Sequence, residues 1–164
     1  MILLKNILVA TDFGDASDVA LSYGRDLART YDATLHVVHV AENVLARYAD
    51  EGTLTLLPQL QIDIEEAARK RMAKLVTDED RTMLHAKPLV LAALGTAEAI
   101  VGYAKEYNVD VIVMGTHGRG ALAHLLMGSV AERVVRTAPC PVLTVRHPEH
   151  EFIVPDALVA VARG

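Results

Sequence analysis

Residues 111–145 read VIVMGTHGRGALAHLLMGSVAERVVRTAPCPVLTV, which places a strand, a glycine-rich loop, a helix and a second strand in series. The apolar, β-branched residues 111–114 predict a parallel strand covered on both faces. Gly115 then opens the loop at the carboxyl end of this strand, the end at which open α/β sheets bind ligands. The loop has about a dozen residues, against a usual length of about two to six, and this length favours a functional role.

The helix after this loop is predicted over residues 130–137, with Ser129 as its N-cap. Glu132 follows three residues later, the spacing of a capping box. Free amide groups and the positive dipole end at this point favour an anion such as phosphate. The alternative is that Ser129 is only a cap and the glycines are only turn residues. Three glycines are expected to take positive φ angles and to let the backbone approach a ligand: Gly115, Gly118 and Gly120.

Two common nucleotide-binding motifs are excluded. GxxxxGK[ST] does not occur, so the lysine that contacts phosphate in a P-loop is missing. Gly115-x-x-Gly118-x-Gly120 has the wrong spacing for the dinucleotide-binding fingerprint. The loop therefore follows neither of these two patterns.

The chain instead resembles the nucleotide-binding universal stress proteins. Their motif G-x2-G-x9-G-[ST] is matched with the full nine-residue gap, and four other segments occur in the family's order: KNILVATDF from Lys5, LHVVHV from Leu35, ALGTAEAIVGYAKEYNVDVIVMG from Ala93 and APCPVLTVR from Ala138. The resemblance covers about residues 3–147, so it implies a universal stress protein domain over residues 1–147. Residues 148–164 are an extension outside it. The residues that match the motif are Gly115, Gly118, Gly128 and Ser129.

The resemblance implies a site for an adenine nucleotide, ATP or AMP. In the family, the aspartate after the first strand, here Asp12, and the residue two before it, Ala10, contact the adenine and ribose end. Alanine replaces the proline often seen there. Val40, or Ala41 if the match shifts by one residue, corresponds to the family residue that meets the adenine edge through its backbone. The candidate binding residues are Ala10, Thr11, Asp12, Val40, Met114, Gly115, Thr116, His117, Gly118, Arg119, Gly128, Ser129 and Val130.

Asp12 is also the candidate partner of a Mg²⁺ ion that bridges the phosphates, because such ions take only one or two carboxylates. Its alternative role is a turn or helix N-cap, with Ser17 and Asp18 as competing caps. The seven histidines offer no metal-binding motif. His36 and His39 lie three apart in a strand and point to opposite faces. Nearer the loop, three residues could supply local positive charge: His117, Arg119 and His124.

Composition narrows the classes of function. Hydrophobic residues make up 52% of the 164 residues, yet no stretch approaches the roughly 18 uninterrupted apolar residues of a membrane span. The net charge of −5 argues against non-specific nucleic-acid binding. The amino end lacks the regions of a secretory signal, and the lone Cys140 excludes an internal disulfide, so a cytoplasmic location is expected. Cys140 is interpreted as a packed residue rather than a redox sensor.

Strands and helices alternate along the chain, which predicts an α/β fold with an open five-stranded, mostly parallel sheet and helices on both faces. The resemblance implies the strand order 3-2-1-4-5, a Rossmann-like sheet of the adenine nucleotide alpha hydrolase-like type, with strands one and four adjacent at the switch point. Pro88 hints that the third strand is an edge. Thr96 is the expected cap of the next helix. The strands are expected within residues 6–10, 34–40, 83–92, 111–114 and 141–145. The helices are expected at residues 16–30, from Pro58 onward, from Thr96 to near Tyr107, and at residues 130–137. The helix from Pro58 is expected to have a core stripe of Leu57, Leu60, Ile64, Ala68, Met72 and Leu75.

The composition of the site favours binding over turnover. It offers backbone donors, small residues and one acidic group, while Ser129 and Glu132 are expected to be engaged in the cap. This composition predicts a regulatory protein whose occupancy by an adenine nucleotide shifts its conformation or its association. The family resemblance implies a role in the stress response, with an unidentified protein as a further partner. Two alternatives stay open: a slow ATPase or phosphotransferase that uses the same site, and a dimeric scaffold whose loop is empty.

The fifth strand, from Pro141 to Val145, is expected at an exposed sheet edge, where unpaired backbone groups invite another chain. Family members commonly dimerise there, so a homodimer is expected, with the apolar extension packed on the domain or on the dimer partner. Residues 42–57 are interpreted as a mobile flap over the nucleotide, with an inert surface insertion as the alternative.

Overall fold

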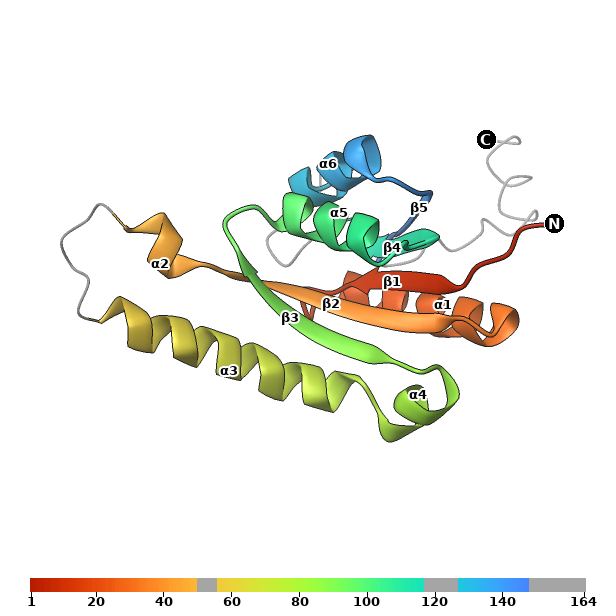
Figure 1. Ribbon diagram of the computed structural model, residues 1–164, viewed down its shortest axis with the longest axis horizontal. Coiled ribbons are helices and arrows are strands. Elements are labelled where there is room, and N and C mark those ends of the chain that lie inside the picture. The colour runs from red at the N-terminus through yellow and green to blue at the C-terminus, as the bar shows by residue number, and fades with distance from the viewer. Residues whose placement is uncertain (50–55, 117–126, 148–164) are drawn as a thin grey trace, which may run out of the picture.

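The computed structural model describes residues 1–49, 56–116 and 127–147. It contains a five-stranded parallel sheet in the order β3-β2-β1-β4-β5 (Figure 1). The predicted fold class and strand order are therefore confirmed. The strands are β1 (Asn6–Ala10), β2 (Thr34–Glu42), β3 (Lys87–Ala93), β4 (Val111–Gly115) and β5 (Val142–Val145).

The central strand of the sheet, β1, is apolar at every position after Asn6. β1 lies between β2 and β4, and Ile7, Leu8 and Val9 have no exposed surface. A strand buried on both faces needs a continuous apolar run rather than an alternating one, which explains its sequence NILVA. β3 and β5 form the two edges. Pro88 lies in edge strand β3, where its missing N–H is tolerated, as the sequence predicted.

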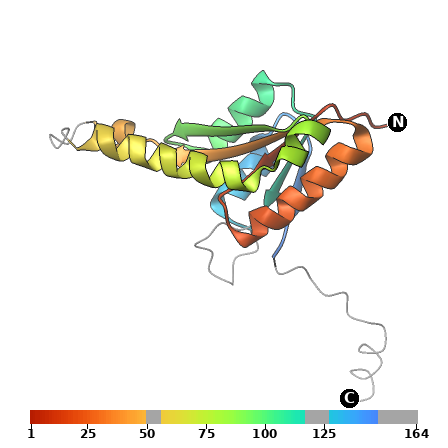
Figure 2. The same ribbon diagram turned by 90° about the horizontal axis from the view of Figure 1, so that it is seen from below.

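Helices cover both faces of the sheet (Figure 2). α1 and α3 contribute to the core on one face, and α5 and α6 contribute to the core on the other. Beyond the carboxyl ends of the strands, α2 and the amino-terminal part of α3 project from the sheet (Figures 1 and 2). The helices are α1 (Asp15–Tyr31), α2 (Val44–Arg47), α3 (Leu57–Leu75), α4 (Asp78–Met83), α5 (Thr96–Glu106) and α6 (Ser129–Thr137).

The projection of α3 explains why its predicted core stripe is only partly correct. Ala68 and Met72 are buried, but Leu60 is 45% exposed. The next residue, Gln61, is buried instead. Its Oε1 accepts a hydrogen bond of 2.9 Å from the backbone amide of Val44 in α2. A polar side chain is tolerated here because its oxygen satisfies an amide at the start of α2.

Short elements and helix caps were the least predictable features. α2 and α4, with 4 and 6 residues, were not expected. The spacing of Thr77 and Asp80 matches a capping box and could have signalled α4. The predicted cap at Thr96 is wrong, because Gly95 is the N-cap of α5 and no side chain caps this helix.

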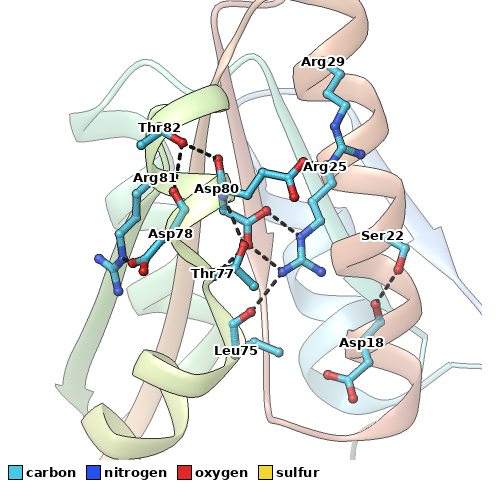
Figure 3. Close-up of polar contacts among 11 residues, drawn as sticks. Asp18, Ser22, Arg25, Arg29, Leu75, Thr77, Asp78, Asp80, Arg81 and Thr82 are labelled. Carbon is cyan, nitrogen blue, oxygen red and sulfur yellow. Dashed lines mark hydrogen bonds and ion pairs between the residues drawn. The ribbon is translucent and has the colours of Figure 1, made fainter.

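α4 is fixed to α1 by a partly buried ion pair (Figure 3). Arg25 donates from Nε and Nη2 to the two carboxylate oxygens of Asp80, at 2.8 and 2.7 Å, and Nη2 also donates to the Leu75 carbonyl at 2.9 Å. The backbone amide of Thr77 donates to Asp80 at 2.9 Å. Burial by itself raises the pKa of Asp80. The hydrogen bonds from Arg25 and Thr77 lower this pKa by more than burial raises it, so the net shift is downward.

His36 and His39 point to opposite faces, as predicted, and each has its own partners. His36 is buried; its Nδ1 lies 2.8 Å from the Tyr103 hydroxyl and its Nε2 lies 3.3 Å from Asn6 Oδ1. Burial, and then the charge of Lys87, lower the pKa of His36 to about 4, so it is neutral at pH 7. It is therefore a satisfied core histidine. Within the described ranges, no group of three or more metal-ligating side chains could hold an ion.

Cys140 packs against the core that includes α5 and α6, and burial raises the pKa of its thiol. Both observations agree with the packed role expected of it, because a raised pKa suppresses the reactive thiolate. In the part of the chain that the structure describes, no helix combines the length and hydropathy needed to cross a membrane.

Candidate functional site

The candidate site lies at the carboxyl ends of β1 and β4. These strands are hydrogen-bonded neighbours, and Ala10 is in register with Met114. The chain leaves β1 toward α1 on one face of the sheet, whereas it leaves β4 toward α6 on the other. This divergence is the topological switch point at which open α/β sheets bind ligands.

A backbone hydrogen bond closes the base of the glycine loop. The amide of Gly128 donates to the Thr116 carbonyl at 2.7 Å, and the amide of Thr116 donates to the Val145 carbonyl of β5 at 2.8 Å. The two ends of the loop therefore meet beside β4, which places the amino end of α6 at the carboxyl edge of the sheet. Predicted site residues from both ends of the loop are brought together here. His117, Gly118 and Arg119 lie outside the described residues.

The start of α6 differs from the prediction. α6 begins at Ser129, its N-cap is Gly128 in extended conformation, and no side-chain hydrogen bond caps it. The predicted capping box of Ser129 and Glu132 is therefore wrong. The Glu132 carboxylate lies 3.7 Å from Arg136 one turn later. Because Gly128 and not Ser129 occupies the N-cap position, the serine hydroxyl is not committed to that role.

The reason for a glycine at position 115 also differs from the prediction. No glycine in the described ranges takes a positive φ, and Gly115 belongs to β4. A Cβ atom at Gly115 would lie 2.9 Å from the Cβ of Ala16 in α1, closer than real Cβ contacts allow. Glycine is therefore required here because α1 approaches the end of β4 closely. This requirement makes the β4 end and the start of α1 one packed unit.

Asp12 lies in a tightly bonded turn between β1 and α1. Its Oδ1 accepts a 2.9 Å hydrogen bond from the amide of Gly14, which is the N-cap of α1. The hydroxyl of Ser17 donates to the Gly14 carbonyl at 2.8 Å and lies 3.1 Å from the hydroxyl of Thr11. Asp12 therefore has the turn role that was one of its two alternatives.

Val40 lies on the neighbouring strand β2. Ala10 is in register with Val38, so Val40 lies two residues farther along β2, toward the carboxyl edge of the sheet. β2 continues to Glu42, two residues past its predicted end, and Ala41 is buried while Val40 is partly exposed. The predicted flap begins with this extension and with α2, but residues 50–55 lie outside the described residues.

Sequence reasoning missed the side chains that hold the turn from the side. Phe13 contacts His39 of β2 and Arg71 of α3. Phe13 has a positive φ of 62°, a conformation that no local pattern signalled. The position of Phe13 directly after Asp12 was the one available hint.

Comparison with known proteins agrees with this architecture. Residues 4–146 match the model of the universal stress protein family. The chain belongs to the universal stress protein family. The universal stress protein MJ0531 of Methanocaldococcus jannaschii is 33% identical over 150 residues, which cover 91% of this chain and 86% of the relative.

Solved structures of family members have the same fold. The protein MJ0577, whose structure was solved to assign its biochemical function, superimposes with a TM-score of 0.78 at 25% identity, over 91% of this chain and all of that one. Two other universal stress proteins share the fold, one solved in complex with cAMP (TM-score 0.56, 23% identity, 88% and 98% covered), the other from Archaeoglobus fulgidus in complex with dAMP (TM-score 0.53, 20% identity, 88% and 99% covered).

Proposed function

We propose that this universal stress protein binds an adenine nucleotide, ATP or AMP, at the adjoining ends of β1, β4 and α6, and that occupancy shifts its conformation or association. The observation that carries the proposal is the hydrogen bond from Gly128 to Thr116, because it seats the start of α6 beside the switch point of the sheet. The dAMP and cAMP complexes of two family members support an adenine nucleotide as the ligand class.

Each part of the site has a chemical role in this proposal. The backbone amides and the dipole at the start of α6 favour the phosphates. Asp12 would accept hydrogen bonds from the ribose, and Val40 would meet the adenine edge through its backbone. Residues 117–119 would complete the phosphate-binding loop.

A Mg²⁺ ion on the phosphates is part of the proposal for ATP. Protein sites for this ion usually supply one or two carboxylates while water and phosphate oxygens complete the coordination. Asp12 is a single carboxylate at the carboxyl edge of β1, so the described residues fit a bridging ion rather than a site made of protein ligands alone. When bound, the ion would neutralise phosphate charge.

A phosphotransferase or slow ATPase is the second candidate, and one observation favours keeping it. Ser129 does not cap α6, so its hydroxyl is not held in the role that had argued against reactivity. A Ser129→Ala protein separates the two functions. A binding protein retains nucleotide affinity and shows no appreciable turnover in either form, whereas an enzyme releases phosphate over many turnovers and loses this with the hydroxyl.

The test of nucleotide binding starts from the ligand that co-purifies with the protein, identified by mass spectrometry after denaturation. Calorimetry with ATP, AMP and GTP then measures specificity. Gly128→Val should abolish adenine-nucleotide binding, because the added bulk blocks close approach of phosphate to the backbone. Gly102→Val is the matched control, since a Cβ at Gly102 meets nothing within 4 Å. Equal affinity in a folded Gly128→Val protein would overturn the proposed site.

We also propose a homodimer through the edge of β5, with residues 148–164 packed on the domain or on the partner. β5 lies at the edge of the sheet, and Leu143 is 38% exposed. A sheet edge presents backbone donors and acceptors to a second chain. Sedimentation at micromolar concentration should report a dimer.

A further inference from the structure

Phe13, the residue after Asp12, contacts one side chain from each of two other elements. Phe13 follows Asp12 in the turn after β1, and its ring centroid lies 4.4 Å from that of His39 in β2. The guanidinium carbon of Arg71, in α3, lies 5.2 Å from the centroid of the Phe13 ring. This distance is typical of a cation–π contact. We call these three residues, Phe13, His39 and Arg71, the turn clamp.

His39 also holds the backbone of the turn. Its Nδ1 lies 2.8 Å from the carbonyl oxygen of Thr11, and because a carbonyl only accepts, Nδ1 carries the proton and donates it. The amide of Thr11 donates to the Val38 carbonyl at 2.9 Å. Thr11 is buried, so loss of the His39 donor would leave its carbonyl without this partner in a region with little access to water. β2 therefore holds both backbone polar groups of Thr11.

The backbone at Phe13 depends on such support. Its φ of 62° is in the left-handed region, which residues with a side chain rarely adopt and which persists only where the surroundings hold it. The hydroxyl oxygen of Thr11 accepts a hydrogen bond of 3.0 Å from the Phe13 amide, and the Phe13 ring contacts His39 and Arg71. Asp12 is thus placed between two residues that are each fixed from outside the turn.

We propose that the turn clamp consists of positioning residues for the nucleotide site: His39, Phe13 and Arg71 fix Asp12 in its binding geometry before the nucleotide arrives. The proposal rests on the proposed function and adds the means by which the site is organised. A preorganised turn improves affinity because binding then does not have to order it. Arg71 also makes the geometry of Asp12 depend on α3, whose amino-terminal part projects beyond the sheet (Figure 2).

Four single variants separate the contributions of the clamp. His39→Phe keeps an aromatic ring and removes the donor, whereas His39→Asn keeps a donor and removes the ring. Arg71→Met removes the cation over Phe13. Arg69→Met is its matched control, because Arg69 is an exposed cation on the same helix that pairs with Glu65 at 2.5 Å.

Calorimetry with ATP should show graded losses. His39→Phe should raise Kd about tenfold, since one hydrogen bond to a buried carbonyl is lost. Arg71→Met should raise Kd about threefold, and Arg69→Met should leave it unchanged. His39→Asn should bind ATP more tightly than His39→Phe. An affinity of His39→Phe equal to that of the unmodified protein would overturn the proposal while the nucleotide function stands.

A double-mutant cycle distinguishes positioning from a general loss of stability. If His39 acts through Asp12, adding His39→Phe to Asp12→Ala should cost little further affinity, whereas independent effects would add. Fully additive losses would overturn the proposal. Amide exchange at Gly14 gives a readout without ligand, because this amide is bonded to Asp12 Oδ1, and it should accelerate in His39→Phe. If the unmodified protein binds no adenine nucleotide, the proposed function fails and the positioning role fails with it.

Discussion

Replacing Asp80 with asparagine tests how much the ion pair between α1 and α4 stabilises the fold. The substitution keeps the shape of the side chain but removes the charge that binds the Nε and Nη2 of Arg25 (Figure 3). Breaking a buried pair costs about 3–5 kcal/mol, whereas exposed pairs contribute about 0–1 kcal/mol. The side chains of Asp80 and Arg25 are 4% and 23% exposed, so solvent partly compensates Arg25. We expect Asp80→Asn to lower the free energy of unfolding by about 2–3 kcal/mol at pH 7.

This loss should depend on pH with a defined sign. The pKa of Asp80 is lower in the folded protein than its ordinary value of 3.8. The unfolded chain therefore binds a proton more readily, and the contribution of Asp80 to stability is fully present above pH 3.8. It is lost as the pH falls through the lower pKa of the folded state. The difference between Asp80→Asn and the unmodified protein should accordingly shrink on acidification below pH 3.8.

Urea denaturation followed by circular dichroism, at pH 7 and at pH 3, measures both quantities. The midpoint of thermal unfolding at pH 7 should fall by roughly 4–12 °C for a domain of this size. Asp26→Asn is the control, because its pair with Arg29 at 3.3 Å is exposed, and its cost should stay below about 1 kcal/mol. The reasoning is refuted if Asp80→Asn costs no more than Asp26→Asn at pH 7, or if its cost is the same at both pH values.

Three further predictions concern the site and the sheet edge. Asp12→Asn retains an oxygen for the Gly14 amide, so the unliganded protein should keep its melting temperature while calorimetry shows ATP binding weakened by roughly 1–3 kcal/mol; unchanged affinity would limit Asp12 to its turn role. Hydrogen exchange in residues 42–57 should slow when ATP is added, and equal rates with and without ATP would reject the flap. The carbonyls of Pro141 and Val145 accept from the amides of Ile112 in β4 and of Thr116 just after it. The alternation of the strand therefore turns the backbone of Leu143 toward β4 and that of Thr144 toward the sheet edge. Thr144→Pro should therefore convert dimers to monomers in sedimentation with the fold intact, whereas a dimeric Thr144→Pro protein would move the interface elsewhere.

The regular elements were predictable because their signals are local. The apolar run NILVA predicted β1 with its observed bounds, and helical periodicity placed α1 within one residue at each end. The alternation of strands and helices predicted the α/β class, and the order of motif segments, through the family resemblance, implied the strand order that the structure shows. Burial of one face gives the apolar residues a period of two in a strand and of 3.6 in a helix. This periodicity can be recognised within one segment, whichever element the segment packs against.

Tertiary structure alone decided the contacts between residues far apart in sequence. Arg25 and Asp80 are separated by 55 positions, and the sequence around either residue does not indicate that the other is its partner. Gly115 is required because Ala16 of α1 lies close to it, and the turn clamp joins Phe13 to residues of β2 and α3. The hydrophobic periodicity of a single segment does not predict either contact. Leu60 has the spacing of a core residue, yet it is exposed, because it belongs to the amino-terminal part of α3 and this part projects beyond the sheet. The sequence determined which surfaces are apolar, whereas the packing of distant elements determined which of those surfaces meet, because pairing depends on where the whole chain places both partners.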